Sequence, residues 1–287
     1  MELKKKISTL LLILSSSAAV ALPVGNLEES SLLCSSVFFC NSCDTFEFCG
    51  PCNEGWFAMR GGYYGDFVFN RYLESAGERQ RNAEIASIQT NAGYLALNFC
   101  SRVDVFTTLG VSCLEIDLNS KLLTPVTAGP LQVVINTKAD FSWSVGARAT
   151  LIDCRCLTWG IEGQYFQYYP ENVKSVTVGK VYSNTDNLNI DLKYYEWQIG
   201  TGVSYHLSSF VVPYAAVKYA RAKIDTNPIA FTVPPGAEIF TIPNFKSRRS
   251  IGVALGVSII GCDFAALTVE GRFIDENALY INAQLRF

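Results

Sequence analysis

The chain has 287 residues, enough for one large domain or two smaller ones, and a net charge of −3. Charged residues make up only 17%, aromatic residues 13%, and the mean hydropathy is +0.19, yet no apolar run of about 18 residues follows the N-terminal region. This pattern excludes a helical membrane protein, and the lack of a basic patch argues against nucleic-acid binding. High apolar content without a long apolar run is typical of membrane β-strands.

The first 21 residues have the three parts of a secretory signal peptide. Lys4, Lys5 and Lys6 form the positive region, Ile7–Leu14 form the apolar core, and Ala19–Ala21 is a small-x-small cleavage site. We therefore expect Leu22 to be the mature N-terminus, because the apolar segment is too short to remain as an anchor. Cleavage leaves 20 basic and 25 acidic residues, a net charge of −5.

Ten cysteines remain in the exported chain, and an oxidising compartment favours disulfides. Five of them lie in residues 22–55, which have no clean periodicity and which we interpret as a disordered or disulfide-tied N-terminal segment. The spacings Cys40-x-x-Cys43 and Cys49-x-x-Cys52 also suit a zinc site. The short gap between the pairs and the export signal favour disulfides, so no metal or other cofactor is expected.

From Trp56 onward, alternating apolar and polar residues predict one β-strand after another. Helical periods are absent, and the nearest candidate, Ser75–Ile88, is better interpreted as a polar loop. We therefore expect residues 56–287 to form one all-β domain. Ten strands are clear, near residues 63–70, 94–99, 103–112, 141–151, 157–165, 195–207, 210–224, 251–259, 267–273 and 279–287.

The last strand, Leu279–Phe287, alternates without a fault and ends on an aromatic residue. This is typical of the closing strand of a bacterial outer-membrane β-barrel, but an edge strand of a soluble β-sandwich would also fit. The lengths of the connections decide between the two. Counted back from the C-terminus, the short connections all fall on one side and the long ones on the other, as in barrels with short periplasmic turns and long external loops.

The short connections are residues 100–102, 152–156, 207–210 and 260–263, and the long ones are 72–90, 114–138, 169–193 and 225–246. Residues 274–278 are the one brief exception on the long side. We therefore predict an antiparallel transmembrane β-barrel with an even number of strands. Its last strand should pair with the first, around Met59–Asn70, because an open sheet edge is not stable in lipid.

The number of strands is less constrained than the fold. Three long connections each hold two further β-like runs, namely residues 114–123 with 131–138, 173–182 with 187–193, and 228–233 with 238–243. Adding these hairpins to the ten clear strands gives sixteen, a usual number for an aqueous channel, and this is our best guess, with twelve to fourteen allowed. If the hairpins only protrude, the barrel is smaller and its lumen can be filled.

The strand phase divides side chains between lipid and lumen. Trp143, Trp159, Trp197, Tyr195, Tyr205 and Phe273 fall on the lipid side, where those near strand ends would form aromatic girdles. The predicted lumen residues are Arg148, Glu162, Glu196, His206, Glu270, Arg272, Asn282, Gln284 and Arg286, with Asp66 as a further inward charge. Charges of both signs in a wide channel give a weak ion preference, although each residue alone could equally be solvated and without effect on flux.

An enzymatic role is not expected. His206 is the single histidine, so a Ser-His-Asp or zinc-hydrolase site lacks the groups it needs. The cysteines instead point to a structural role, because nine of them fall before the first strand or in short turns on the periplasmic side: Cys34, Cys40, Cys43, Cys49, Cys52, Cys100, Cys154, Cys156 and Cys262. Cys113 lies alone near the opposite rim. We predict a thiol-rich periplasmic collar, the alternative being that cysteines simply gather at strand ends.

Short segments along the whole mature chain resemble the chlamydial major outer membrane protein, a β-barrel porin. They occur in the order of the family and are specific as a combination. They are Leu22–Asn26, Met59–Phe69, Ala96–Asn98, Val103–Phe106, Ser144–Ala149, Tyr195–Gln198, Lys246–Arg248, Thr268–Glu270, Ile274–Glu276 and Asn282–Phe287. The chain is shorter than the family pattern in its loops, and Cys34 and Cys262 depart from it, which indicates a shorter paralogue or a divergent member.

The resemblance implies a porin of the bacterial outer membrane that assembles as a trimer. It also implies passive diffusion of ions and small hydrophilic solutes, and disulfide links to other copies or to other Cys-rich envelope proteins. From the residues themselves, two functions stay open: a diffusion channel that is also a structural part of the envelope, or a structural or adhesin-like surface barrel with a narrow or plugged lumen.

Overall fold

The computed structural model describes residues 22–29, 43–45, 57–75, 82–100, 102–120, 131–154, 156–178, 181–183, 192–208, 210–226, 230–232, 239–241, 244–261 and 265–287. The predicted signal peptide and most of the Cys-rich segment, residues 30–42 and 46–56, lie outside this description. Among the helices within the described ranges, none is long and apolar enough to cross a membrane.

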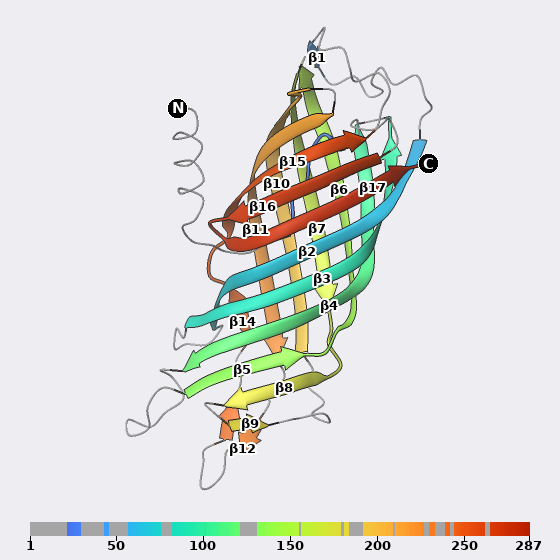
Figure 1. The fold of residues 1–287 in the computed structure, drawn as a ribbon. Helices are drawn as coiled ribbons and strands as arrows, with labels where there is room; N and C mark the ends of the chain where they lie inside the picture. Colours follow the sequence, from blue (N-terminus) through green and yellow to red (C-terminus); the bar gives the residue numbers. More distant parts are fainter. Residues whose placement is uncertain are drawn as a thin grey trace, which may run out of the picture.

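Ten long antiparallel strands form a closed ring, seen from the side in Figure 1. Each pairs with its neighbours in the ring, and the order follows the sequence except where shorter strands intervene. The ring strands are β2 (Phe57–Ser75), β3 (Asn82–Phe99), β4 (Val103–Ser120), β6 (Asp140–Cys154), β7 (Leu157–Tyr168), β10 (Leu192–Tyr205), β11 (Val211–Thr226), β15 (Ile251–Gly261), β16 (Ala265–Phe273) and β17 (Glu276–Arg286).

The pairing of β17 with β2 closes the barrel, as predicted. Its register runs from Glu276 opposite Arg71 to Arg286 opposite Arg60, and the backbone N–H of Phe287 donates to Met59 O at 2.9 Å. A closed ring leaves no sheet edge exposed, which is the condition for strands to cross a membrane.

The two ends of the barrel differ. We call the end with the short connections 100–102, 155–156, 206–210 and 262–264 and the C-terminus the turn end, and the opposite end the loop end. The short strand β1 (Cys43–Thr45) pairs with the end of β6 at the turn end (Figure 1). These four short connections thus lie on one side, as the sequence predicted, and residues 274–275 between β16 and β17 are the brief exception at the loop end.

Six further strands lie at the loop end. β5 (Leu131–Thr137) pairs with the last part of β4, β8 (Val173–Val178) pairs with β5, and β9 (Val181–Ser183) pairs with β8. β12 (Ala230–Thr232) and β13 (Ile239–Thr241) form a separate hairpin. β14 (Phe245–Ser247) lies between β11 and β2 and pairs with both, so it fills the ring beyond the shorter strands β15–β17.

The ring has ten strands instead of the sixteen that we guessed and the twelve to fourteen that we allowed. The ten are the ten clear strands of the sequence. Of the additional β-like runs, 131–138, 173–182, 228–233 and 238–243 contain or overlap β5, β8, β9, β12 and β13, which extend the loop end without entering the ring. The described parts of the other two runs, 114–123 and 187–193, belong to the ring strands β4 and β10. The interpretation of residues 72–90 as a long loop was wrong, because β2 continues to Ser75 and β3 already begins at Asn82.

The face of the strands that carries the apolar side chains changes along the barrel. In the middle, apolar side chains face outward, with Leu109 exposed to 57% and Ile199 to 59%. Near the loop end the inward positions are apolar and buried, such as Leu114 and Ile116, while the intervening Glu115 is exposed. Because alternation still holds but its apolar side changes, the loop end has the pattern of a barrel surrounded by water.

Candidate functional site in the barrel interior

A segment from the N-terminal region, Leu22–Glu29, lies inside the barrel. All eight of its residues are buried, and they form hydrogen bonds or ion pairs with side chains from β2, β6, β10, β11, β15, β16 and β17. Leu22 lies toward the loop end and Glu29 toward the turn end. The inward polar face of the strands therefore meets protein atoms along this path.

The strands supply hydrogen-bond partners for the buried backbone of this segment. The N–H groups of Val24 and Gly25 donate to the carboxylate of Glu270 at 3.1 and 2.8 Å. The side-chain amide of Gln198 donates to Pro23 O at 2.9 Å. Pro23 itself has no N–H that would need a partner in this interior. An extended segment can thus be buried here without leaving these backbone groups unpaired.

Position 25 requires glycine for two reasons, its backbone conformation and the lack of space for a Cβ. Its φ is +67°, a left-handed conformation that favours glycine. A Cβ at this position would lie 2.7 Å from Nη2 of Arg148. The same nitrogen donates to Val24 O at 3.1 Å, so the missing side chain allows the guanidinium to approach the backbone.

Arg148 and Arg60 anchor the segment toward the turn end. Arg148 pairs with Glu29 and, at 2.7 Å, with Glu162. Arg60 pairs with Asp104 and donates to Glu29 O at 2.7 Å. All five side chains are buried, and removing one partner of a buried ion pair typically costs about 3–5 kcal/mol. This network therefore holds the segment specifically.

Glu28 pairs with His206 where β10 ends at the turn end. The backbone N–H of His206 donates to Cys156 O at 2.8 Å. This hydrogen bond holds His206 beside the turn between β6 and β7. Burial alone would lower the pKa of His206, but the hydrogen bond and the charge of Glu28 outweigh it and raise this pKa above its usual value. The contact is therefore strongest when the imidazole is protonated.

Glu196 holds the other end of the segment, at Leu22, toward the loop end. It accepts two hydrogen bonds from Arg71, at 2.6 and 2.8 Å, and one from the Tyr194 hydroxyl at 2.7 Å. The backbone nitrogen of Leu22 also donates to it, at 3.1 Å. Four donor contacts on one buried carboxylate define the inner end of the segment's path.

A second group of charges borders Leu22 from the other side. Lys218 donates to Leu22 O at 2.8 Å and pairs with Glu276 at 2.9 Å. Glu276 also pairs with Arg272 at 2.6 Å, and Arg272 pairs with Asp66. The inward charge predicted at Asp66 is thus part of a buried network with β16 and β17.

Beyond these charges, apolar side chains close the loop end of the interior. The cluster consists of Leu22, Val68, Leu73, Ala86, Ile88, Leu114, Ile116, Ile135, Phe166, Tyr168, Val173, Leu192, Tyr194, Ala222, Ile224, Phe245 and Ala278. The cavity beside Leu22 has a volume of about 10 Å³, room for about one water molecule. Where the structure describes it, this end of the lumen is packed like a protein core.

The predicted lumen residues do face the interior. Seven of them are buried there: Arg148, Glu162, Glu196, Glu270, Arg272, Asn282 and Gln284. His206 and Arg286 are partly exposed at the turn end. Several of these side chains bind Leu22–Glu29 or one another instead of facing an open channel, and a role in ion passage stays a prediction.

The sequence pattern did not predict the interior position of Leu22–Glu29 or the role of four inward charges of the ring, Arg60, Arg71, Asp104 and Lys218. The four lie on the inward phase of their strands, so alternation could have found them. The segment has no periodic signal, because each of its residues is positioned by different strands.

Four of the described cysteines have an assigned state. Cys100, Cys154 and Cys156 at the turn end are disulfide-bonded, and Cys113 on β4 carries a free thiol. The backbone of Cys43 pairs with Cys154 through β1. Cys34, Cys40, Cys49, Cys52 and Cys262 lie outside the described residues. Within the described ranges, no group of histidine, cysteine or acidic residues is arranged to hold a metal ion.

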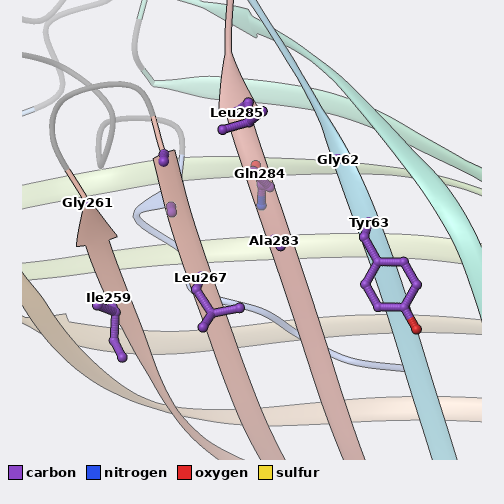
Figure 2. Close-up of a pocket in the computed structure, with 10 residues that line it drawn as sticks. Gly62, Tyr63, Ile259, Gly261, Leu267, Ala283, Gln284 and Leu285 are labelled. Atoms are coloured by element: carbon purple, nitrogen blue, oxygen red, sulfur yellow. The ribbon is translucent and has the colours of Figure 1, made fainter.

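A hollow of about 600 Å³ lies on the outer face of the ring, over β15, β16, β17 and β2 (Figure 2). Leu267, Ile259, Leu285 and Tyr63 surround it, and Ala283 forms part of its floor. These outward positions are apolar, so the hollow belongs to the surface that faces lipid in a membrane barrel and is no path through the protein.

Comparison with known proteins gives one consistent family. The Chlamydia major outer membrane protein family matches residues 2–83, 125–181, 176–242 and 237–287. The major outer membrane porin of Chlamydia trachomatis serovar B is 30% identical over an alignment of 400 residues, and that of Chlamydia muridarum is 29% identical over 410. Each alignment covers 100% of both chains.

The structural matches include two outer membrane proteins of low similarity. An outer membrane channel from Pseudomonas putida F1 has a TM-score of 0.39 and 8% identity, covering 85% of this chain and 99% of its own. The outer membrane protease OmpT from Escherichia coli has a TM-score of 0.37 and 10% identity, covering 80% and 96%. Both TM-scores are below 0.5, so the assignment rests on the sequence matches and on the closed ring itself. The chain therefore belongs to the Chlamydia major outer membrane protein family and is a β-barrel of the bacterial outer membrane.

Proposed function

We propose that this protein is an outer-membrane porin whose lumen is closed by its own segment Leu22–Glu29. Ions and small hydrophilic solutes would pass when this segment leaves the lumen. The relatives are named as major outer membrane porins, which supports a diffusion channel. The observation that carries the closed state is the burial of all eight residues of Leu22–Glu29 against charged side chains of the ring.

The mode of attachment supports a removable closure. Leu22–Glu29 pairs with ring side chains through hydrogen bonds and ion pairs and is not a strand of the ring. Its displacement would leave the strand pairing intact. It would also expose buried charges to water, which can hydrate them, so the interior would change from a packed core to a wet channel.

The test is conductance in planar bilayers. The mature wild-type protein should show a small conductance with infrequent openings, whereas a variant that lacks residues 22–29 should show stable, ohmic steps several-fold larger. Heat-modifiable migration on gels would first verify that both proteins are folded barrels. A folded deletion variant without conducting steps would contradict the diffusion-channel function.

A cross-linked variant gives the matched control. A Cβ on Gly200 would lie 3.2 Å from both γ-carbons of Val24, so the pair Val24→Cys and Gly200→Cys can hold the segment in place by a disulfide. The oxidised variant should stay closed under conditions that open the wild type, and a reductant should restore openings. The wild-type protein in the same reductant controls for effects on its own disulfides.

A structural or adhesin-like barrel is the second candidate, and the filled interior favours it. Under this hypothesis the variant that lacks residues 22–29 would not conduct either.

We further propose a trimer and disulfide links between chains or to other Cys-rich envelope proteins. The cysteines outside the described ranges would contribute to these links. Whole envelopes run on reducing and non-reducing gels test the links, since a monomer in both lanes refutes them. We propose no catalytic activity.

A further inference from the structure

The backbone nitrogen of Leu22 is placed as a terminal group would be. It lies inside the barrel, 3.1 Å from Oε1 of Glu196, and Leu22 is only 4% exposed. The small-x-small motif Ala19–Ala21 predicts cleavage directly before this residue. After cleavage the nitrogen is an α-ammonium group, which carries a positive charge at neutral pH.

The charged side chains around this nitrogen include more carboxylates than cations. Arg71, Lys218 and Arg272 form ion pairs with the carboxylates of Glu196, Glu276 and Asp66. Two further buried carboxylates border the group without bringing a cation of their own: Glu270, which binds the N–H groups of Val24 and Gly25, and Asp275. Five carboxylates thus face three cations.

Asp275 makes the shortage of positive charge plain. Among the described residues, both of its carboxylate oxygens are buried without a hydrogen-bond partner. It is within electrostatic reach of Lys218, Arg71 and Arg272, whose charges it shares with Glu196 and Glu276. Each uncompensated buried charge is costly, so an additional cation among these groups is stabilising.

The side chain and the carbonyl oxygen of Leu22 are also bound inside the barrel. Leu22 belongs to the apolar cluster and lines the same small cavity as Val68, Ile88, Phe166 and Tyr194, and Lys218 donates to its carbonyl oxygen at 2.8 Å. The site therefore combines a carboxylate for the nitrogen, a cation for the carbonyl and an apolar pocket for the side chain. These are the groups needed to recognise a peptide that begins with an apolar residue.

We propose that Glu196 and its neighbours form a binding site for a free α-ammonium group, and that the mature N-terminus at Leu22 occupies it. Removal of the signal peptide then does more than release the chain. It replaces a hydrogen bond from a neutral amide to the carboxylate by an ion pair in which donor and acceptor both carry a charge. A chain cleaved one residue earlier or later would place the ammonium away from Glu196, so the cleavage position and the seating of the segment are matched.

The accessibility of the α-amine tests this proposal. The mature barrel is treated with sulfo-NHS acetate at pH 7, and acetylation of the N-terminal peptide is followed by mass spectrometry. In the folded wild type the reaction should be at least about tenfold slower than in the unfolded chain, the factor that corresponds to one unit of proton affinity. Glu196→Gln should accelerate it by about fivefold or more, because the amide has no negative charge to stabilise the ammonium.

The matched control is Glu115→Gln, which makes the same chemical change at an exposed carboxylate on the outer side of β4, away from the terminal nitrogen. It should change the rate by less than about twofold. A mature chain that begins at Ala21 keeps every ring side chain and moves the ammonium by about 3.5 Å. It should react at least as fast as Glu196→Gln, and it carries the test if that variant does not fold.

Three results would overturn the proposal: an α-amine in the folded wild type that reacts at the unfolded rate, equal acceleration by Glu196→Gln and Glu115→Gln, or an Ala21 chain as protected as the wild type. None of these measurements depends on conduction. A barrel that never conducts would still protect its N-terminus, so this proposal and the porin function fail separately.

Discussion

Single residues decide whether the N-terminal segment fits the interior, and Gly25 is the clearest case. It combines a φ of +67° with a guanidinium 2.7 Å from the position of a Cβ. Strain of this kind costs of order 1–3 kcal/mol. We expect Gly25→Ala to lower the free energy of unfolding by about that amount, or to expel the segment and increase conductance.

Denaturant unfolding and bilayer recording on the same preparation distinguish these two outcomes for Gly25→Ala. Gly93→Ala is the control, because a Cβ on Gly93 would meet nothing closer than Leu109 O at 3.8 Å. If both substitutions have the same effect, the close approach of Arg148 is not the cause.

The pair of His206 and Glu28 makes the attachment of the segment depend on pH. Because the folded-state pKa of His206 is raised, its contribution is fully present below the unfolded value of about 6.5 and is lost as the pH rises through the folded value. His206→Ala should therefore cost about 1.5–3 kcal/mol at pH 6, the range for a charge-assisted hydrogen bond, and clearly less at pH 9. Denaturant unfolding of both proteins at the two pH values measures this difference, and an equal loss at both would refute it.

At the scale of elements, alternation predicted the ten ring strands and named inward residues on or beside six of them, β2, β6, β7, β10, β16 and β17. It did not predict where the apolar side changes. Residues such as Glu74, Ser87 and Glu115 made the loop end look like polar loops, although they are the outward positions of strands that continue beyond the membrane. A strand surrounded by water on one side and packed on the other has the opposite pattern from one in lipid, so one rule for the whole chain was insufficient.

The interior segment could not be predicted for a different reason. A strand is recognised from its own periodicity, but the place of Leu22–Glu29 depends on contacts such as Leu22 with Glu196, 174 residues apart, and Gly25 with Glu270, 245 apart. The signal peptide located the mature N-terminus, and alternation located the inward charges. Nothing local connected the two.

Because the apolar face changes from outward to inward along a strand, truncating an apolar side chain should cost different amounts of stability at its two ends. On β4, Ile116 is fully buried in the apolar cluster, whereas Val111 is 48% exposed on the outer face. Ile116→Ala should lower the free energy of unfolding by about 2–5 kcal/mol, as for a core cavity. Val111→Ala should have a much smaller effect. Denaturant unfolding in the same detergent compares them, and similar losses at both positions would mean that the loop end has no packed core.

At the scale of the whole molecule, the number of strands sets the state of the interior. A barrel of about eight strands is just filled by its own side chains, whereas about sixteen leave an aqueous channel. The ten strands found here leave room for one extended segment with its partners. The filled lumen therefore follows from the size of the ring, which the sequence left open because the protruding hairpins have the same periodicity as ring strands.

Removing the segment should leave an interior with nearly balanced charge. Among the residues that the structure describes, the buried charged side chains that remain are seven acidic and six basic: Asp66, Asp104, Glu162, Glu196, Glu270, Asp275 and Glu276, with Arg60, Arg71, Arg102, Arg148, Lys218 and Arg272. Charges of both signs along one channel largely cancel in the field that a passing ion meets. A barrel lacking residues 22–29 should therefore be a weakly selective channel.

The reversal potential of this deletion variant in a tenfold KCl gradient measures the selectivity. An ideally selective channel would give about 59 mV, and we expect less than about a third of that value, with a small preference for cations. Adding Arg60→Ala and Arg148→Ala removes two inward cations and should move the potential clearly toward the cation limit, because Asp104 and Glu162 then lose their partners. If the potential stays unchanged, ions do not pass these side chains, and the conducting path lies outside the interior that Leu22–Glu29 fills.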